Sequence, residues 1–145
     1  EKSKMIATAE SCTGGLISHR LTEVPGSSSV YLGGMVVYSN DAKINLLGVE
    51  NSIIQKHGAV SKETAAAMAV NVSKKFSADY GISITGLAGP TGGSPDKPIG
   101  LVYIGLANGE NLAVKKFRFG ENRKRNKLRI SQAGLDWLRK SLLHD

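Results

Sequence analysis

Residues 5–15, MIATAESCTGG, decide the fold. Residues 5–8 are a short apolar run, which predicts a buried strand, and the polar, glycine-rich turn AESCTGG follows at once. Apolar residues then recur at helical spacing from Leu16 to Val24, until Pro25 and Gly26 end the helix. Open α/β sheets bind ligands where the carboxyl end of a strand leads into a helix N-terminus. This stretch therefore predicts an α/β fold and also the place of its site.

The remaining chain continues the alternation of strands and helices. Apolar or alternating runs predict strands at residues 33–38, 80–85, 101–107 and 112–119, and helical patterns cover residues 41–46, 61–76 and 122–143. Helices between strands favour a parallel core, whereas Asn108-Gly109 indicates a hairpin and so an antiparallel element. We predict one domain over residues 1–145, a three-layer α/β/α sandwich with a mixed, mostly parallel five-stranded sheet.

Composition excludes several classes of protein. Of 145 residues, 41% are hydrophobic and 21% are charged, which is typical of a globular domain. No apolar run approaches the ~18 residues of a membrane span, and the first residues lack a signal-peptide core, so we expect no membrane association and a cytoplasmic location. One cysteine and three widely spaced histidines give no metal-ligand spacing. We therefore expect neither a metal nor another cofactor.

The net charge of +7 belongs to one segment. Residues 115–129 contain eight basic residues against one acid, Glu121, whereas the rest of the chain has eleven of each sign. Such a segment raises the possibility of nucleic acid or another phosphate-bearing partner. The alternative for most of the eight is a solvated face.

Ser11 and Lys43 are the candidates for chemistry. Ser11 lies in the turn before a helix N-terminus, where backbone N–H groups near Thr13 could hold an oxyanion, although Ser11 or Thr13 could instead only cap the helix. Cys12 is the rival nucleophile. A serine needs a base, and Lys43, at the start of a helix after the second strand, serves if its pKa is lowered. The alternative is a solvated lysine paired with Asp41 or Glu50.

The segment from Gly86 to Gly100 is too long and too glycine-rich for a simple connection. It does not match a Walker loop, because Lys97 is not followed by Ser or Thr. Its glycines, with Thr91, Ser94 and Lys97, could still cradle a phosphate or ribose; the alternative is a flexible lid without a ligand.

Taken together, these blocks resemble the C-terminal domain of CinA, the family that includes nicotinamide mononucleotide deamidase (PncC). The resemblance rests on five blocks in order: TAESCTGG at 8–15, GGMVVYSNDAK at 33–43, HGAVSKETAAAMA at 57–69, GLAGPTGGSPDKPIGLVYIGLA at 86–107, and the Phe117, Gly120, Arg123 pattern. It covers almost the whole chain from Thr8, without the helix that usually precedes the first strand in the family.

The resemblance implies a fold like the anticodon-binding domains and a metal-free Ser/Lys amidohydrolase that converts nicotinamide mononucleotide (NMN) to nicotinate mononucleotide and ammonia. It implies Ser11 and Lys43 as the catalytic pair, with Tyr38 beside them. The implied substrate-binding residues are Thr13, Gly14, Gly15, Ser39, Asn40, Gly86, Ala88, Gly89, Gly92, Gly93, Lys97 and Arg123. Family members often carry a second Arg four residues after the first; here Lys127 occupies that position.

The implied partner is NMN, and the family suggests a homo-oligomer. Two other classes of function stay open: a regulatory domain that binds a pyridine nucleotide without turnover, and a nucleic-acid-binding module that uses residues 115–129. Aromatic residues that could stack on bases are sparse near that segment, which makes nucleic acid the weaker alternative.

Overall fold

The computed structural model describes residues 3–145 and has five strands, five α-helices and one short 3₁₀-helix in that range. The strands are β1 (Ile6–Glu10), β2 (Tyr31–Val36), β3 (Tyr80–Gly86), β4 (Leu101–Asn108) and β5 (Asn111–Arg118). The helices are α1 (Leu16–Thr22), η1 (Ser27–Ser29), α2 (Asn40–Asn45), α3 (Asn51–His57), α4 (Lys62–Phe76) and α5 (Arg123–Leu143).

The five strands form one mixed sheet in the order β2-β1-β3-β4-β5. β1 is parallel to both β2 and β3, and β4 is antiparallel to both β3 and β5. The mixed five-stranded sheet is therefore confirmed, with parallel pairing in half of its four junctions rather than in most of them. The reason is local: after β3 the chain makes only a loop and a hairpin, and neither can provide a crossover to a parallel strand.

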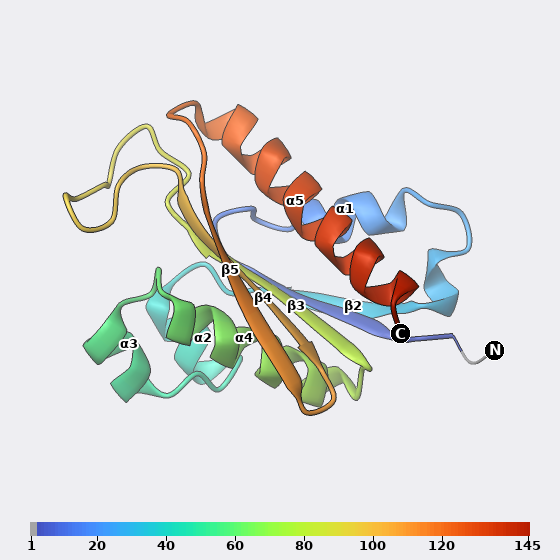
Figure 1. Cartoon of the computed structure of the whole chain (residues 1–145). Helices are drawn as coiled ribbons and strands as arrows, with labels where there is room; N and C mark the ends of the chain where they lie inside the picture. Colours follow the sequence, from blue (N-terminus) through green and yellow to red (C-terminus); the bar gives the residue numbers. More distant parts are fainter. Residues whose placement is uncertain (1–2) are drawn as a thin grey trace.

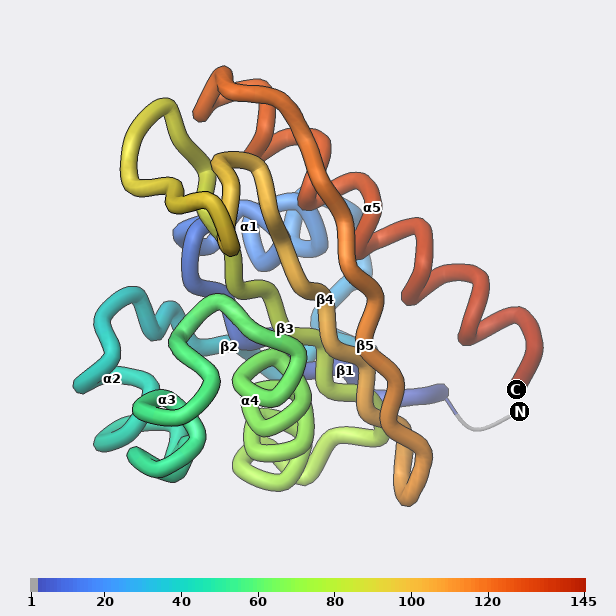
Figure 2. Tube along the Cα trace, turned by 60° about the vertical axis from the view of Figure 1, so that its left-hand side comes forward, coloured from blue at the N-terminus to red at the C-terminus, as the bar shows by residue number. Residues whose placement is uncertain are grey.

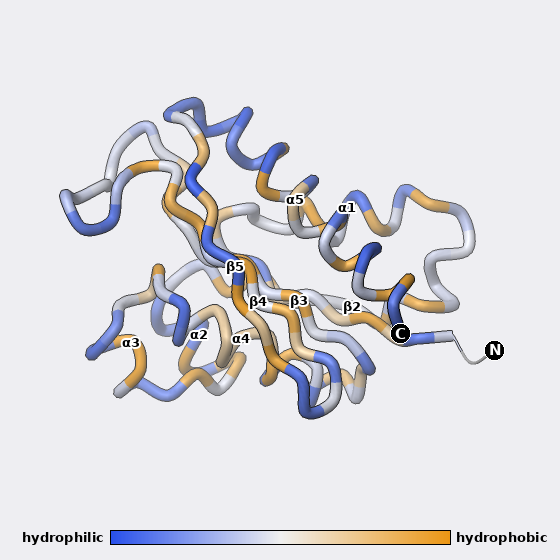
Figure 3. The backbone as a smooth tube through the Cα atoms, in the orientation of Figure 1, coloured by the Kyte–Doolittle hydropathy of each residue, from blue (hydrophilic) through white to orange (hydrophobic). Residues whose placement is uncertain are grey.

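Helices cover both faces of the sheet (Figure 1), which confirms the three-layer sandwich. Helices α1 and α5 lie on one face and pack Ile17, Ile130 and Leu138 against the strands. Helices α2, α3 and α4 lie on the other face, as the rotated trace in Figure 2 also shows. Apolar colouring concentrates on the central strands in Figure 3, whereas the tip of the β4–β5 hairpin is hydrophilic. None of the helices between residues 3 and 145 is long and apolar enough to cross a membrane.

Three helix N-termini follow from local side-chain chemistry. Ser61 caps α4, Ser39 caps α2 and Asn122 caps α5, each by accepting a hydrogen bond from a backbone N–H inside the helix. The Asn108-Gly109 hairpin joins β4 to β5 as expected. Helix α3 was not predicted; its seven residues provide only two apolar positions that pack inward, Ile53 and Ile54, too few for a periodic signal.

Helix α4 lies very close to the sheet, because glycines face it from the two strands beneath. A Cβ at Gly81 on β3 would lie 2.2 Å from Ala69 O and 2.8 Å from Ser73 Cβ. A Cβ at Gly105 on β4 would lie 2.6 Å from Ala65 O. The helix backbone occupies the volume that side chains would need, so this contact requires glycine at both positions.

We expect Gly81→Ala to lower the free energy of unfolding by about 1–3 kcal/mol, since the helix backbone must move away from the sheet. Gly120→Ala is the matched control, because the nearest atom to its Cβ would be Asn126 Oδ1 at 3.9 Å. The control should change stability by about 0.5 kcal/mol or less in urea denaturation. Equal effects of the two substitutions would contradict the close packing of α4.

Candidate active site

A pocket of about 270 Å³ opens at the carboxyl ends of β1 and β3. The chain leaves β1 through α1 on one face and reaches β3 through α4 on the other, so this is the switch point where such sheets bind ligands. Its volume is close to the lower end of small-molecule sites, about 300 Å³. It is lined by Ser11, Cys12, Tyr38, Asn40, Lys43, Ala59, Val60, Thr85, Gly86, Leu87, Ala88, Gly89, Thr91 and Arg123.

Ser11 and Lys43 meet at the base of this pocket. Lys43 Nζ lies 3.0 Å from Ser11 Oγ, within hydrogen-bond distance. The same nitrogen donates to the backbone oxygens of Val37 and Tyr38, each at 3.0 Å. An uncharged amine has two N–H donors and one lone pair. In the uncharged form, with both donors directed at the carbonyl oxygens, the lone pair would face Ser11 Oγ, whose hydroxyl otherwise donates to Tyr38 O at 3.5 Å.

Lys43 is 1% exposed, and burial lowers its pKa below the ordinary value of 10.5. Desolvation acts this way because an ammonium ion loses more hydration than a neutral amine. None of the ion pairs among residues 3–145 includes Lys43. The alternative pairing with Asp41 or Glu50 is therefore not what the structure contains, and the environment favours the form that can accept a proton.

Cys12 adjoins Ser11 in sequence and also lines the pocket, but its environment suppresses thiolate formation. Burial raises the pKa of the Cys12 thiol to about 12. The thiol therefore stays protonated near neutral pH, and the thiolate is the nucleophilic form of cysteine. Of the two neighbouring candidates, Ser11 is the one with a base beside it.

Arg123 closes one side of the pocket from the first turn of α5. Its Nη2 donates to Tyr38 Oη and its Nη1 donates to Gly89 O, each at 2.8 Å. The buried Asn126 donates to Ala88 O one turn further along the helix. Helix α5 thus fixes the segment after β3 and connects it to the Tyr38 ring.

The outer part of the Gly86–Gly100 loop lies away from the pocket lining. Gly86, Ala88 and Gly89 contribute to the pocket, but Gly92, Gly93 and Lys97 do not. Lys97 Nζ instead donates to His57 O at 2.6 Å. This places the predicted phosphate-binding lysine at the end of α3, where it ties the loop to the neighbouring layer.

The turn at Thr13–Gly15 also differs from expectation. The N-terminus of α1, where we expected backbone N–H groups to hold an oxyanion, instead binds the carboxylate of Glu10, which accepts hydrogen bonds from Ile17 N and Ser18 N. Thr13 Oγ1 donates to the same carboxylate, and Gly14 N donates to Ser11 O. Neither Thr13, Gly14 nor Gly15 lines the pocket, so an oxyanion donor must be sought nearer Ser11.

Two further predicted residues are split between roles. Asn40 lines the pocket beside Lys43, whereas Ser39 is directed at the backbone as the cap of α2.

Glu10 and Asn126 were missed by sequence reasoning. Each has a weak signal in hindsight, since Glu10 is an acid at the end of an apolar strand and Asn126 lies on the apolar side of a helix.

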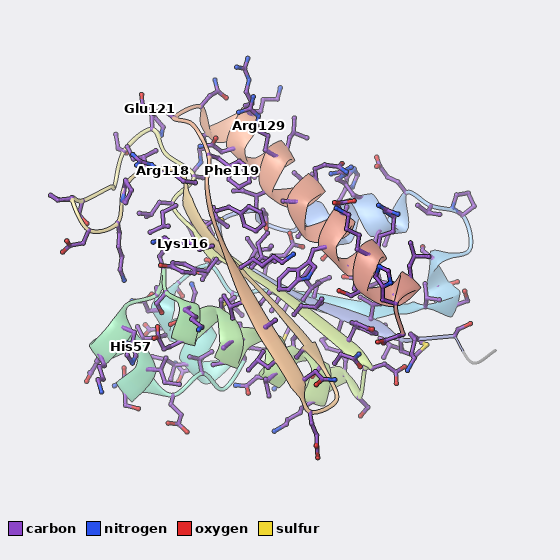
Figure 4. The ribbon with its side chains drawn as sticks, in the orientation of Figure 1. His57, Lys116, Arg118, Phe119, Glu121 and Arg129 are labelled. Atoms are coloured by element: carbon purple, nitrogen blue, oxygen red, sulfur yellow. The ribbon has the colours of Figure 1, made fainter. Side chains whose placement is uncertain are left out.

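The basic residues of 115–129 are dispersed and carry no ion pair among the described residues. Figure 4 shows Lys116 and Arg118 on β5 and Arg129 on α5, at separate positions. Only Arg123 lines the pocket, while Lys127 Nζ approaches Gly14. Within residues 3–145, no three His, Cys, Asp or Glu side chains are gathered as metal ligands would be.

Comparison with known proteins agrees with this architecture. The family model described as the CinA C-terminal domain matches residues 1–142. A CinA-like protein of Kosmotoga olearia is 49% identical over 138 residues, covering 95% of this chain and 34% of its own length. A putative competence-damage inducible protein of Alkaliphilus metalliredigens is 51% identical over 144 residues, covering 99% and 35%. The chain thus spans about a third of the length of these relatives.

Solved structures give the same result. The competence/damage inducible protein CihA of Agrobacterium tumefaciens superposes with a TM-score of 0.92 at 41% identity, covering 95% of this chain and 85% of its own. The CinA superfamily protein KP700603 of Klebsiella pneumoniae superposes with a TM-score of 0.95 at 29% identity, covering 99% and 89%. This chain belongs to the CinA C-terminal domain family.

Proposed function

We propose that this chain is an amidohydrolase that releases ammonia from NMN and yields nicotinate mononucleotide. The observation that carries the proposal is the 3.0 Å contact between Ser11 Oγ and Lys43 Nζ, an amine that is buried and has no carboxylate paired with it. A hydroxyl beside an uncharged amine is a nucleophile with its base, the pairing that acyl transfer requires. The NMN assignment rests on the family resemblance and on Arg123, a guanidinium at the same pocket that suits a phosphate.

The reaction proceeds in two acyl-transfer steps. Ser11 Oγ attacks the amide carbonyl carbon while its proton moves to Lys43 Nζ. Lys43 then gives this proton to the departing nitrogen, which leaves as ammonia, and an ester links Ser11 to the nicotinoyl group. In the second step Lys43 takes a proton from water, the hydroxide adds to the ester carbonyl, and the proton returns to Ser11 Oγ as nicotinate mononucleotide leaves.

The remaining pocket residues position the substrate. Arg123 is exposed and uses two of its five N–H donors on Tyr38 and Gly89, which leaves three for phosphate oxygens. The segment from Gly86 to Gly89 lies beside the same space, which leaves room there for the ribose. Tyr38 Oη is held by Arg123 and its backbone oxygen by Lys43, so one residue connects the phosphate end of the pocket to the reacting end.

Ser11→Ala and Lys43→Met should each lower kcat for ammonia release from NMN by about a thousandfold or more, because members of such a pair act as a unit. The double variant should be no worse than either single one. Ser52→Ala and Lys56→Met, which alter exposed residues of α3, should keep wild-type turnover. Near-normal turnover by Ser11→Ala would refute the mechanism. Binding of NMN by the wild type without ammonia release would favour the regulatory alternative.

Cys12→Ala should keep kcat within about threefold of wild type, because the protonated thiol takes no part in the reaction. Iodoacetamide at pH 8 should leave the activity intact for the same reason. Mass spectrometry of the treated protein measures how much Cys12 has been alkylated. If Cys12→Ala lost turnover to the same extent as Ser11→Ala, the nucleophile would have to be reassigned to Cys12.

The value of kcat/KM should rise with pH as Lys43 loses its proton, with a midpoint below 10.5 and a plateau above it. The sign follows from the mechanism, because the base must be uncharged and burial lowers its pKa. The profile is read above pH 7, where the substrate phosphate, with a second pKa of about 6, no longer titrates. A rate that falls over this range, or that still climbs beyond 10.5, would be inconsistent with Lys43 as the base.

A further inference from the structure

Glu10 is a buried carboxylate that the proposed reaction does not use. Glu10 is 1% exposed and directly precedes Ser11 in the sequence. Its Oε1 accepts hydrogen bonds from Thr13 Oγ1 at 2.7 Å and Ile17 N at 2.9 Å. Its Oε2 accepts from Ser18 N at 3.0 Å and Ser18 Oγ at 2.6 Å. All four partners are donors, and no ion pair among residues 3–145 involves Glu10.

These bonds close the turn that carries Ser11. On one side, the backbone of Glu10 is fixed in the sheet, since Val37 N donates to Glu10 O and Ser11 N donates to Ile84 O. On the other side, the Glu10 carboxylate holds Thr13 and the first turn of α1. Gly15, the N-cap residue of α1, has no side chain to do this. Ser11 therefore lies between the sheet, to which its own N–H is bonded, and the segment from Thr13 to the start of α1 that the Glu10 carboxylate holds.

The spacing between Ser11 and Lys43 depends on this turn. Lys43 is placed from the opposite side, by α2 and by the carbonyl oxygens of Val37 and Tyr38. Proton transfer needs heavy atoms about 2.6–3.2 Å apart, so a small displacement of the turn is enough to break the contact. Glu10 is absent from the residues that line the pocket, and its effect must pass through the backbone.

We propose that Glu10 is a positioning residue that holds Ser11 Oγ within reach of Lys43 Nζ by binding both Thr13 and the start of α1. The inference rests on the Ser11–Lys43 reaction proposed above. It predicts that loss of the carboxylate lowers kcat and leaves KM unchanged. The residues that contact the substrate stay in place, whereas the distance from Ser11 Oγ to Lys43 Nζ changes.

Glu10→Gln is the principal variant. It keeps the shape of the side chain, but its amide nitrogen cannot accept, so one backbone N–H at the start of α1, that of Ile17 or of Ser18, loses its partner, whereas the hydroxyl beside it can turn to accept. We expect kcat for ammonia release to fall at least tenfold while KM stays within about threefold. The midpoint of the pH profile should not move, because Lys43 keeps its own surroundings. Ser18→Ala removes a single donor and should lower kcat by a smaller factor, again at constant KM.

Met68→Ala provides the matched control for lost stability. Met68 is fully buried on α4 and does not line the pocket, so its truncation lowers Tm by leaving a cavity without disturbing the Ser11 turn. If Glu10→Gln and Ser18→Ala lower Tm as Met68→Ala does, yet all three keep wild-type kcat, Glu10 is a structural cap only and the proposal fails. Should Glu10→Gln not fold, Ser18→Ala decides on the same criterion.

A second measurement separates this proposal from the choice of substrate. A fluorophosphonate reacts with an activated serine by forming a phosphorus–oxygen bond and releasing fluoride, and mass spectrometry then measures the labelling rate of Ser11. If the wild type is labelled but releases no ammonia from NMN, the substrate assignment fails. The role of Glu10 is then supported if Ser11 is labelled more slowly in Glu10→Gln than in the wild type, and refuted if the two rates are equal. If the wild type is neither labelled nor active, the reaction and the role of Glu10 fail together.

Discussion

Everything at the site depends on a lysine amine held in the protein interior with no carboxylate beside it. Burying an ammonium ion without a counter-ion is costly, so the interior favours the uncharged form of Lys43. Two separated pieces of chain create this environment, because Lys43 and the two carbonyl oxygens beside it belong to one segment. Helix α2 supplies Lys43, the end of β2 supplies two carbonyl oxygens, and the end of β1 supplies Ser11. The parallel pairing of β1 with β2 brings the last two together, and so the topology of the sheet determines which groups meet at the pocket.

A second buried side chain near Ser11, that of Glu10, is held by a different set of contacts. Glu10 is as deeply buried as Lys43, but four donors satisfy its two oxygens, including two backbone N–H groups at the start of a helix. Such donors stabilise a negative charge in place of water. The helix end that sequence reasoning assigned to the substrate therefore serves the protein's own carboxylate. A substrate anion would be repelled there, and Arg123 is the cation of the pocket that remains for it.

The limits of sequence reasoning at this site follow from the kind of interaction involved. Strand and helix positions could be predicted because hydrophobic period, caps and Asn108-Gly109 are local signals. Ser11 and Lys43 became candidates because each lies at a strand–helix junction, and the family resemblance then favoured them over a helix cap and a solvated lysine. Their burial, and the 3.0 Å contact between them, depend on residues 32 positions apart. The same holds for two hydrogen bonds to backbone oxygens. Asn126 donates to Ala88 O across 38 positions, and Lys97 donates to His57 O across 40. Contacts at such separations leave no periodic pattern in the chain.

The long glycine-rich loop shows how the basic segment and the pocket belong together. At its base, Asn126 and Arg123 of α5 hold Ala88 and Gly89, and Leu87 N donates to Leu101 O. At its far side, Lys97 is tied to His57, directly before the turn that supplies Ala59 and Val60 to the pocket. With both ends attached, the base of the loop forms part of the pocket wall, and its outer part is tied to α3. Arg123 can then bind a phosphate without releasing the loop, because a guanidinium has five donors and the wall uses only two of them.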